Sequence, residues 1–434
     1  MSSVIALETG DEKNIKTYKT LLEHLKIFDR KRGISRANDK YLIFTTKENN
    51  GNTLQDLERE LELPETARLV SVESTVIKSV SAGGSNLRVA VEQTLKVLNG
   101  RYPLSDDEVQ QFIVITPNRY YIYGNLLLIS AGSFAESELG RRISHEFPSF
   151  FHDFYVLLSA QVGVTHIALN APISDYDNQM RKPMSLQCLF GNFGPSITQQ
   201  SISAPSSCEL ESEFWATTRQ NGIYQTWAPR YTMFSRGNIK EKARVLGFKR
   251  VKDNMIVDLY AGIGYFTFSY IEAGARTVFC WEINPWSVEG LLRGARVNKW
   301  SVQLVRHEEK WESRQIPKIV VFLENNRHAV SRYLNEIRDK VDFPLSHINL
   351  GLLPDSKQGW ETAVELSAQS SESSVVLHVH ANVLASGIDA WTRETENQLT
   401  SLAGGKKVRF VDISKIKSFA PGVCHVCGDF ELLI

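Results

Sequence analysis

The sequence predicts an α/β protein whose C-terminal part is built on a mostly parallel sheet, with a smaller α+β region before it. From about residue 230 onward, short apolar segments alternate with amphipathic helical segments. One of these apolar segments runs through a glycine-containing turn into a helix at 255–273. The chain has 434 residues, more than one ordinary core requires. Strands that alternate with helices pair in parallel and are covered on both faces.

The bulk composition excludes several classes of protein. Hydrophobic residues make up 42% of the chain and charged residues 23%, as in ordinary globular proteins. The five cysteines are scattered, which favours a reducing compartment over a disulfide framework. We find no secretory signal and no apolar run near the roughly 20 residues of a membrane helix, so we expect a cytoplasmic protein. Basic and acidic residues number 49 each, so an RNA-binding surface must come from local basic clusters.

We expect three regions: an α+β region at 1–140, a β-rich linking domain at 141–229, and an α/β domain at 230–434. Hydrophobic periodicity places the elements of the first two regions. Helices are predicted at 17–28, 53–63, 86–98 and 150–158. Strands are predicted at 111–115, 121–130 and 165–169. A Ser-rich loop is expected at 199–207, and Asn221-Gly222 is a signal for a tight turn.

The third region is predicted to form a seven-stranded, mostly parallel sheet. Its helices are expected at 240–246, 265–273, 286–298, 359–367 and 390–402. Its strands are expected at 255–259, 277–283, 319–323, 347–350, 374–380, 408–415 and 423–433.

The turn after the first of these strands carries the strongest local signal. Asp258 ends the strand, and Gly262 and Gly264 let a ligand approach the backbone closely. Thr267 stands where a dinucleotide-binding turn would have a third glycine, which favours an adenosyl ligand without pyrophosphate. Taken alone, the motif is equally consistent with an ordinary glycine-rich turn.

Polar residues also end the next three strands. Glu282 can accept hydrogen bonds from both hydroxyls of a ribose, and the alternative is a solvated carboxylate. Asn325 and Asn326 lie where an adenine edge would bind, although asparagine clusters often only mark turns. Asn349, late in the fourth strand, could position a substrate base or simply satisfy a turn.

Ser235 precedes a helix that carries Lys242 and Arg244, and a cation there could meet a cofactor carboxylate or an RNA phosphate. Phosphate contacts would make RNA binding fall with added salt, whereas the alternative is a solvated surface. The candidate RNA-binding residues are Arg30, Arg32, Arg244, Lys249 and Arg250.

These stretches resemble the wybutosine-synthesising tRNA aminocarboxypropyltransferases, which are related to the tRNA guanine-N1 methyltransferases. The resemblance covers about half the chain, from near residue 220 to the end, and the divergent N-terminal region looks fungal. The matching motifs are Asn221-Gly222-Ile223, Met233-Phe234-Ser235 with Gly237-Asn238 and Glu241-Lys242, Asp258 to Phe266, Glu282 with Asn284-Pro285, Asn349 to Pro354, His378 to Asn382, and Ser418 to Gly422.

The resemblance implies a Rossmann-like class I methyltransferase fold. It also implies transfer of the 3-amino-3-carboxypropyl group of S-adenosylmethionine to C7 of a 4-demethylwyosine-type base at position 37 of phenylalanine tRNA, in the anticodon loop. We expect a monomer without metal, in which the region 1–140 binds tRNA and the domain at 230–434 is catalytic. The expected cofactor-binding residues are Ser235, Lys242, Asp258, Tyr260, Gly262, Gly264, Glu282, Asn325 and Asn326, and relatives usually carry Asp at 325. Asn349 and Pro354 are candidates for substrate positioning, and the catalytic base stays unknown.

Both this transfer and methylation are attacks on a carbon attached to a sulfonium, so positioning supplies much of the rate and no nucleophilic side chain is expected. The alternatives are a guanine-37 N1-methyltransferase and a non-catalytic RNA-binding protein of the same fold. Cys424, Cys427, His378 and His380 are expected to be structural, because no second cysteine pair or nearby carboxylate completes a metal site in the sequence. Among the tryptophans, Trp286 is the candidate for base stacking, because it follows Glu282 to Pro285 at the expected site.

Overall fold

The structure is a computed structural model that describes residues 3–9, 14–29, 34–37, 40–48, 53–61, 63–64, 67–73, 87–170, 183 and 186–434. The chain forms two compact units. The first comprises Met1–Asn118 with Gly132–Val162, and the second comprises Arg119–Ala131 with Gly163–Ile434. No helix among the described residues is long and apolar enough to cross a membrane.

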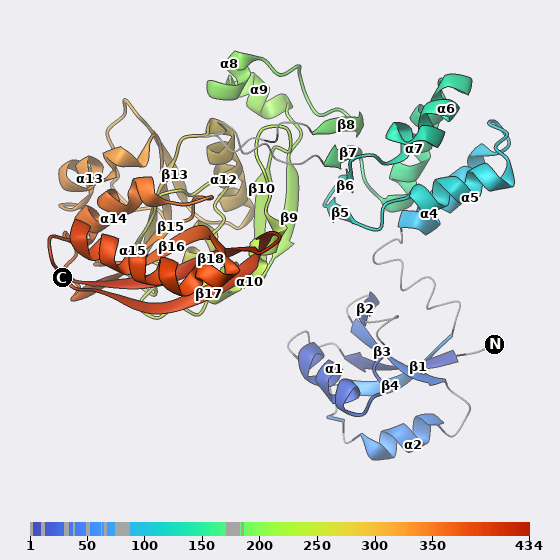
Figure 1. Cartoon of the computed structure of the whole chain (residues 1–434), viewed down its shortest axis with the longest axis horizontal. Helices are drawn as coiled ribbons and strands as arrows, with labels where there is room; N and C mark the ends of the chain where they lie inside the picture. Colours follow the sequence, from blue (N-terminus) through green and yellow to red (C-terminus); the bar gives the residue numbers. More distant parts are fainter. Residues whose placement is uncertain are drawn as a thin grey trace. The chain divides into compact units, whose positions relative to one another are not determined.

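The first unit begins with a four-stranded antiparallel sheet in the order β2-β3-β1-β4 (Figure 1). Its elements are β1 (Ser3–Thr9), α1 (Ile15–His24), β2 (Ile34–Ala37), β3 (Lys40–Glu48), α2 (Thr53–Glu60) and β4 (Ala67–Glu73). Leu22 of α1 and Leu57 of α2 share one apolar cluster with Leu7 and Ile43 of the sheet. The two helices therefore stabilise the sheet by burying its apolar side chains.

The same unit contains a helical part with an aromatic core. Its helices are α4 (Leu87–Leu98), α5 (Asp106–Ile115), α6 (Glu138–Glu146) and α7 (Phe150–Val162). The rings of Phe112, Phe150 and Phe154 pack against one another and are fully buried. The predicted strand at 111–115 is wrong, because Ser105 and Glu108 form a capping box that starts α5 upstream.

The second unit begins with small sheets. A four-stranded sheet has the order β5-β6-β7-β8, and a hairpin joins β9 to β10. These strands are β5 (Tyr120–Tyr123), β6 (Leu126–Ser130), β7 (His166–Asn170), β8 (Gln187–Phe190), β9 (Ala216–Gln220) and β10 (Ile223–Trp227). The predicted tight turn at Asn221-Gly222 is confirmed, with positive φ at both residues.

Two predictions about this part of the chain are wrong. The single strand expected at 121–130 is a hairpin, since Gly124 adopts a positive φ between β5 and β6. The loop expected at 199–207 contains α8 (Gln199–Ser203) and is followed by α9 (Ser207–Ser212). Thr198 and Ser206 cap these short helices with their side-chain oxygens.

The second unit is dominated by an eight-stranded sheet in the order β13-β14-β12-β11-β15-β16-β18-β17. The first six strands are parallel, and the pairings of β18 with β16 and β17 are antiparallel. The strands are β11 (Met255–Asp258), β12 (Thr277–Glu282), β13 (Val302–Arg306), β14 (Ile319–Leu323), β15 (Leu345–Leu350), β16 (Ser374–Leu384), β17 (Val408–Ala420) and β18 (Val423–Leu433). The mostly parallel sheet is confirmed, but the predicted seven strands omitted the edge strand β13.

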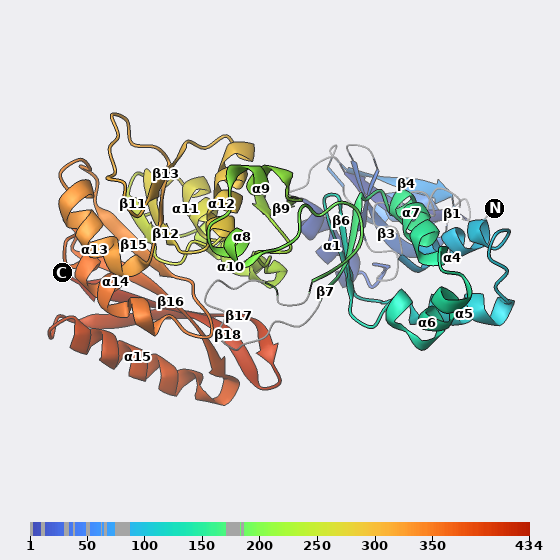
Figure 2. The same ribbon diagram turned by 90° about the horizontal axis from the view of Figure 1, so that it is seen from above.

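Helices cover both faces of this sheet, as expected for parallel strands (Figure 2). One face packs against α10 (Ile239–Val245), α11 (Thr267–Glu272) and α12 (Pro285–Val297). The other packs against α13 (Ala329–Arg332), α14 (Trp360–Ser367) and α15 (Ile388–Leu402). This two-sided packing fixes the carboxyl ends of the parallel strands, where α/β folds of this kind bind ligands.

The predicted regions 1–140, 141–229 and 230–434 divide the chain differently from the two compact units. The expected boundary at residue 140 lies inside α6, and residues 119–131 belong with the C-terminal part. The functional roles given to the three regions stay predictions.

Gly264 in the turn after β11 has a φ of +85°, and a Cβ there would lie 2.7 Å from the ring of buried Phe268. We expect Gly264→Ala to lower the free energy of unfolding by about 1–3 kcal/mol for the strained φ, with a further loss for the clash. Gly405→Ala is the matched control, since Gly405 has a φ of +86° and open space around it. Thermal unfolding followed by circular dichroism checks this, and equal losses in the two variants would contradict the role of the Phe268 contact.

Candidate active site

A cavity of about 860 Å³ lies at the carboxyl ends of the parallel strands of the second unit. Its floor is formed by the turn after β11 and by the ends of β12 and β14. Residues from β5, β6, β10 and β17 line it as well. The cavity is thus built around the strand ends that the sequence predicted, with walls from elements far away in the chain.

Glu282 at the end of β12 holds the glycine-rich turn. One carboxylate oxygen accepts the backbone N–H of Gly262 at 2.8 Å, and the other accepts the N–H of Asn284 at 2.8 Å. Burial raises the pKa of Glu282, and these backbone N–H groups act in the opposite direction. Each oxygen keeps a lone pair for a further donor, so the carboxylate can accept two hydroxyl groups from a ligand in the cavity.

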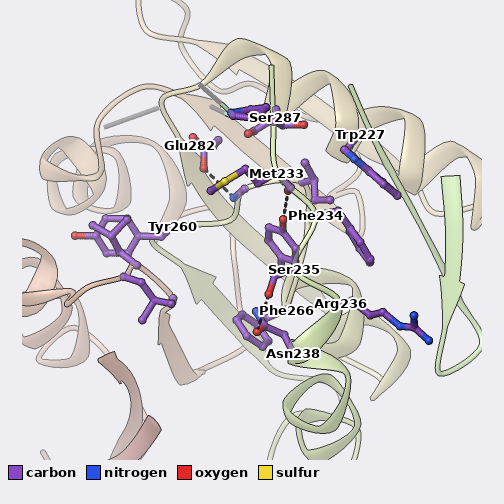
Figure 3. Close-up of a pocket in the computed structure, with 18 of the residues that line it drawn as sticks. Trp227, Met233, Phe234, Ser235, Arg236, Asn238, Tyr260, Phe266, Glu282 and Ser287 are labelled. Atoms are coloured by element: carbon purple, nitrogen blue, oxygen red, sulfur yellow. Dashed lines mark hydrogen bonds between the residues drawn. The ribbon is translucent and has the colours of Figure 1, made fainter. Parts of the chain in front are cut away.

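Tyr260, Asn325 and Asn326 line the cavity near Glu282. The Asn326 side chain donates to the carbonyl of Leu259 at 2.8 Å, and the Asn325 oxygen accepts the N–H of Arg327 at 3.0 Å. Figure 3 shows Tyr260 and Glu282 on the same side of Met233. This arrangement places an aromatic ring, a carboxylate and two amides around one end of the cavity.

Asp258 and Asn349 lie behind the cavity and do not line it. Asp258 is fully buried and accepts hydrogen bonds from the Thr267 hydroxyl at 2.7 Å and the Asn349 amide at 2.9 Å. Burial raises the pKa of Asp258, and the two side-chain donors oppose the shift. The geometry therefore gives Asp258 and Asn349 a supporting role, in which they join β11, α11 and β15. Gly264 is likewise part of this support, whereas Pro354 does line the cavity.

Ser235 is placed in the cavity wall by the short 3-10 helix η4 (Arg236–Asn238). Its hydroxyl donates to the side-chain oxygen of buried Asn238 at 3.1 Å and accepts a hydrogen bond from the Lys417 ammonium at 2.7 Å. Lys417 belongs to β17 and also lines the cavity. The sequence analysis missed Lys417, although it directly precedes the motif from Ser418 to Gly422 that carries part of the resemblance.

Lys242, which the resemblance placed beside the cofactor, does not line the cavity. It is 3% exposed and its ammonium donates to the side chains of Gln225 and Gln220. Burial, together with the charge of Lys417, lowers the pKa of Lys242 to about 7. Its ammonium lies over the rings of Phe234 and Tyr265, which do line the cavity. Lys242 therefore supports the cavity wall from behind.

The other end of the cavity is aromatic. The rings of Trp227 and Phe234 stack at 4.4 Å, and the edge of Tyr123 meets both. The guanidinium of Arg236 lies over the ring of Tyr121 at 5.1 Å. Figure 3 shows Trp227 and Arg236 on the side of Met233 away from Glu282. The sequence analysis missed these rings. Trp227 and Tyr123 are buried, so the partly exposed Phe234 and Tyr121 are the rings at this end that can stack a nucleobase.

Trp286, by contrast, is not available for base stacking. It is 1% exposed, stacks on Tyr231 at 3.6 Å and donates its N–H to the carbonyl of Ser201. Its place just after the end of β12 reflects packing against α8 and Tyr231.

Of the predicted RNA-binding residues, Arg244, Lys249 and Arg250 lie in the part of the chain that the structure describes. Arg30 and Arg32 lie outside the described residues. Arg244 is occupied internally by Glu241 and Asp429, which does not favour a contact with phosphate. Lys249 is exposed, and Arg250 donates to the Ser374 carbonyl at the start of β16, so both lie near the amino ends of the strands, opposite the cavity.

The histidines expected to lack a carboxylate do have one nearby. His378 donates from Nδ1 to the Asp429 carboxylate at 2.7 Å, its Nε2 shares a hydrogen bond with Nδ1 of His347 at 2.9 Å, and His380 contacts His425. Burial lowers the pKa of His347 and of His380 to about 3. Among the described residues, two groups of side chains come close enough to be considered for a metal, and Cys427 belongs to both: Glu241, His380 and Cys427, and His378, Cys427 and Asp429. Their hydrogen bonds to one another and to Arg244 already use much of their binding capacity.

Comparison with known proteins shows which class of protein has this fold and site. Residues 216–340 match the model of the TRM5/TYW2 methyltransferase domain. The structure is also similar to a solved structure of TYW2 from Pyrococcus horikoshii in complex with MeSAdo, with a TM-score of 0.51, 18% identity, and coverage of 79% of this chain and 99% of that one. These matches place the chain among transferases with the Rossmann-like class I methyltransferase fold.

Two curated relatives then identify the family. The chain is 43% identical to tRNA wybutosine-synthesizing protein 2 of Schizosaccharomyces pombe over 325 residues, which are 73% of this chain and 72% of that protein. It is 40% identical to the protein of the same name from Saccharomyces cerevisiae, over 62% of this chain and 60% of that protein. The chain belongs to the tRNA wybutosine-synthesizing protein 2 family.

Proposed function

We propose that this chain transfers the 3-amino-3-carboxypropyl group of S-adenosylmethionine to C7 of a 4-demethylwyosine-type base at position 37 of phenylalanine tRNA. The observation that carries the proposal is the cavity itself, which joins a Glu282 carboxylate at the end of β12 to an aromatic wall at Trp227 and Phe234. The family membership favours this reaction over methylation of guanine.

Within this proposal the two ends of the cavity have separate roles. Glu282 binds the ribose hydroxyls, and Asn325 and Asn326 lie beside the adenine. The aromatic end receives the flat base of the tRNA. When bound, S-adenosylmethionine supplies a carbon made electrophilic by the adjacent sulfonium. The residues of the chain hold the two reactants together, exclude water and set which carbon faces the base, and such positioning can account for much of the rate.

The reaction needs no covalent intermediate with the enzyme. A C–C bond forms at C7 as the S–C bond breaks, methylthioadenosine leaves with the electron pair, and the C7 proton passes to solvent or to a base. No step needs a nucleophilic side chain, and the described residues that line the cavity include no cysteine and no histidine.

The location and partner of the protein follow as part of the same proposal. We infer a cytoplasmic monomer that binds the anticodon loop of phenylalanine tRNA, with the region 1–140 contributing to tRNA binding. The exposed Lys249 is retained as a candidate phosphate contact, and its replacement by Ala would reduce the salt dependence of tRNA binding if it contacts RNA.

The test is the mass gained by the base next to the anticodon. The purified protein is incubated with S-adenosylmethionine and tRNA from cells that lack this activity, and the digested nucleosides are analysed by mass spectrometry. We expect a gain equal to an aminocarboxypropyl group, with release of methylthioadenosine. A methyl gain with release of S-adenosylhomocysteine would assign the protein to guanine methylation. No gain, with tRNA binding intact, would indicate a non-catalytic RNA-binding protein.

A further inference from the structure

We propose that Lys417 binds the carboxylate of the aminocarboxypropyl arm of the donor. The inference deepens the proposed function, since it rests on S-adenosylmethionine as the donor. Lys417 reaches the cavity wall from β17, and its ammonium lies 2.7 Å from the hydroxyl of Ser235.

The cations around the cavity differ in what they can contact. Among the described residues that line it, the cationic side chains are Arg236 and Lys417. Arg236 lies over Tyr121 at the aromatic end, and in Figure 3 its side chain points away from Glu282. Lys242 is held behind Phe234 and Tyr265 by two glutamines. Lys417 is therefore the cation that faces the cavity beside Ser235.

The backbone around Lys417 is shaped to bring its side chain to this place. The register of β17 against β18 shifts between Lys415 and Lys417, and bulges of this kind redirect a side chain. Gly237 provides the space, because a Cβ at that position would lie 2.6 Å from the Lys417 Cδ. The ammonium thus passes over the glycine and reaches Ser235, whose hydroxyl also contacts the buried Asn238.

The donor contains a carboxylate that can pair with the Lys417 ammonium. The adenosine part contains no anion, whereas the aminocarboxypropyl arm ends in a carboxylate next to an ammonium. With the ribose at Glu282, the arm extends into the same cavity that Ser235 and Lys417 line. A carboxylate there would accept a charge-assisted hydrogen bond from Lys417 and a second hydrogen bond from Ser235. Because the carboxylate belongs to the transferred group, this contact also orients the carbon that reacts.

Two ligands that differ in this arm provide the test. S-adenosylmethionine carries the arm on its sulfonium, whereas methylthioadenosine lacks the arm and has a neutral thioether with the same adenosyl and methyl groups. We expect Lys417→Met to raise the Kd of S-adenosylmethionine about tenfold or more and to change the Kd of methylthioadenosine less than about twofold, both measured by isothermal titration calorimetry on the full chain. Lys415→Met, in an exposed position of the same strand that does not line the cavity, should change neither.

The pattern across variants separates this role from others. Glu282→Ala should weaken both ligands, because the ribose is common to them. Equal weakening of both ligands by Lys417→Met, or unchanged binding of both, would overturn the proposal. Weaker tRNA binding with unchanged S-adenosylmethionine binding would instead assign Lys417 to an RNA phosphate. If Lys417→Met does not fold, Lys417→Gln keeps the polar contact with Ser235 and tests the charge alone. The binding data do not depend on which group is transferred, so a methyl product in the mass experiment leaves this test intact.

Discussion

Replacing Glu282 by Ala is expected to raise the Kd of S-adenosylmethionine by one to two orders of magnitude. The carboxylate is the acceptor proposed for two ribose hydroxyls, and hydrogen bonds to a charged group are worth roughly 1.5–3 kcal/mol each. The same oxygens hold the N–H groups of Gly262 and Asn284, so the variant also loosens the turn that forms the floor of the cavity. Calorimetric titration of the purified variant measures the change.

Two further variants make this result specific to the carboxylate. Glu282→Gln keeps the size of the side chain, but its amide nitrogen must face one of two backbone N–H groups, so we expect it to bind nearly as weakly as the Ala variant. Glu361→Ala, in an exposed position of α14, controls for the loss of a surface charge. An unchanged Kd for Glu282→Ala would remove this residue from the donor site.

Replacing Arg244 by Met should cost about 3 kcal/mol or more of the free energy of unfolding. Arg244 joins α10 to β18 through Glu241 and Asp429, whose side chains are 1% and 9% exposed. Without the guanidinium, two buried carboxylates remain next to Cys427, and breaking a buried ion pair in this way typically costs 3–5 kcal/mol. Chemical denaturation followed by circular dichroism gives the loss in stability.

Arg409→Met is the matched control for this prediction. Arg409 pairs with Glu431 on the same sheet, but its side chain is 60% exposed, and exposed ion pairs contribute only about 0–1 kcal/mol. The two variants therefore differ mainly in burial. If they lower the stability equally, the buried network around Arg244 does not stabilise the fold as argued.

The fold could be predicted where local patterns decide the structure. The apolar strands and capped helices from 255 onward were recognised because each parallel strand is buried on both faces, as at β11 and β12. β13 was missed, since it is an edge strand with polar Gln303 and Arg306 among its five residues. The wrong strand prediction at 111–115 could have been avoided from the sequence, because Ser105 and Glu108 have the spacing of a capping box that begins a helix.

The site was predictable only along one edge of the sheet. Residues at the ends of parallel strands meet in space, so Tyr260, Glu282 and the Asn325-Asn326 pair could be brought together from sequence. The sequence could not show which of these side chains are buried behind the cavity. Asp258 and Lys242 both lie there, and this is evident only from their hydrogen bonds with Asn349 and Gln225. Trp227 and Lys417 come from other elements, and the register that positions them depends on the whole sheet.

The order of the last strands has a consequence for how the protein is made. β18 lies between β16 and β17, although β17 is synthesised first. A nascent chain that has reached Ala420 therefore contains β17 but not the strand that pairs it with the sheet. Lys417 and Phe419 can take their places in the cavity wall only after Val423–Leu433 has been translated and has paired with β16. A premature stop codon within this final strand would thus remove few residues and still leave the donor site without one of its walls.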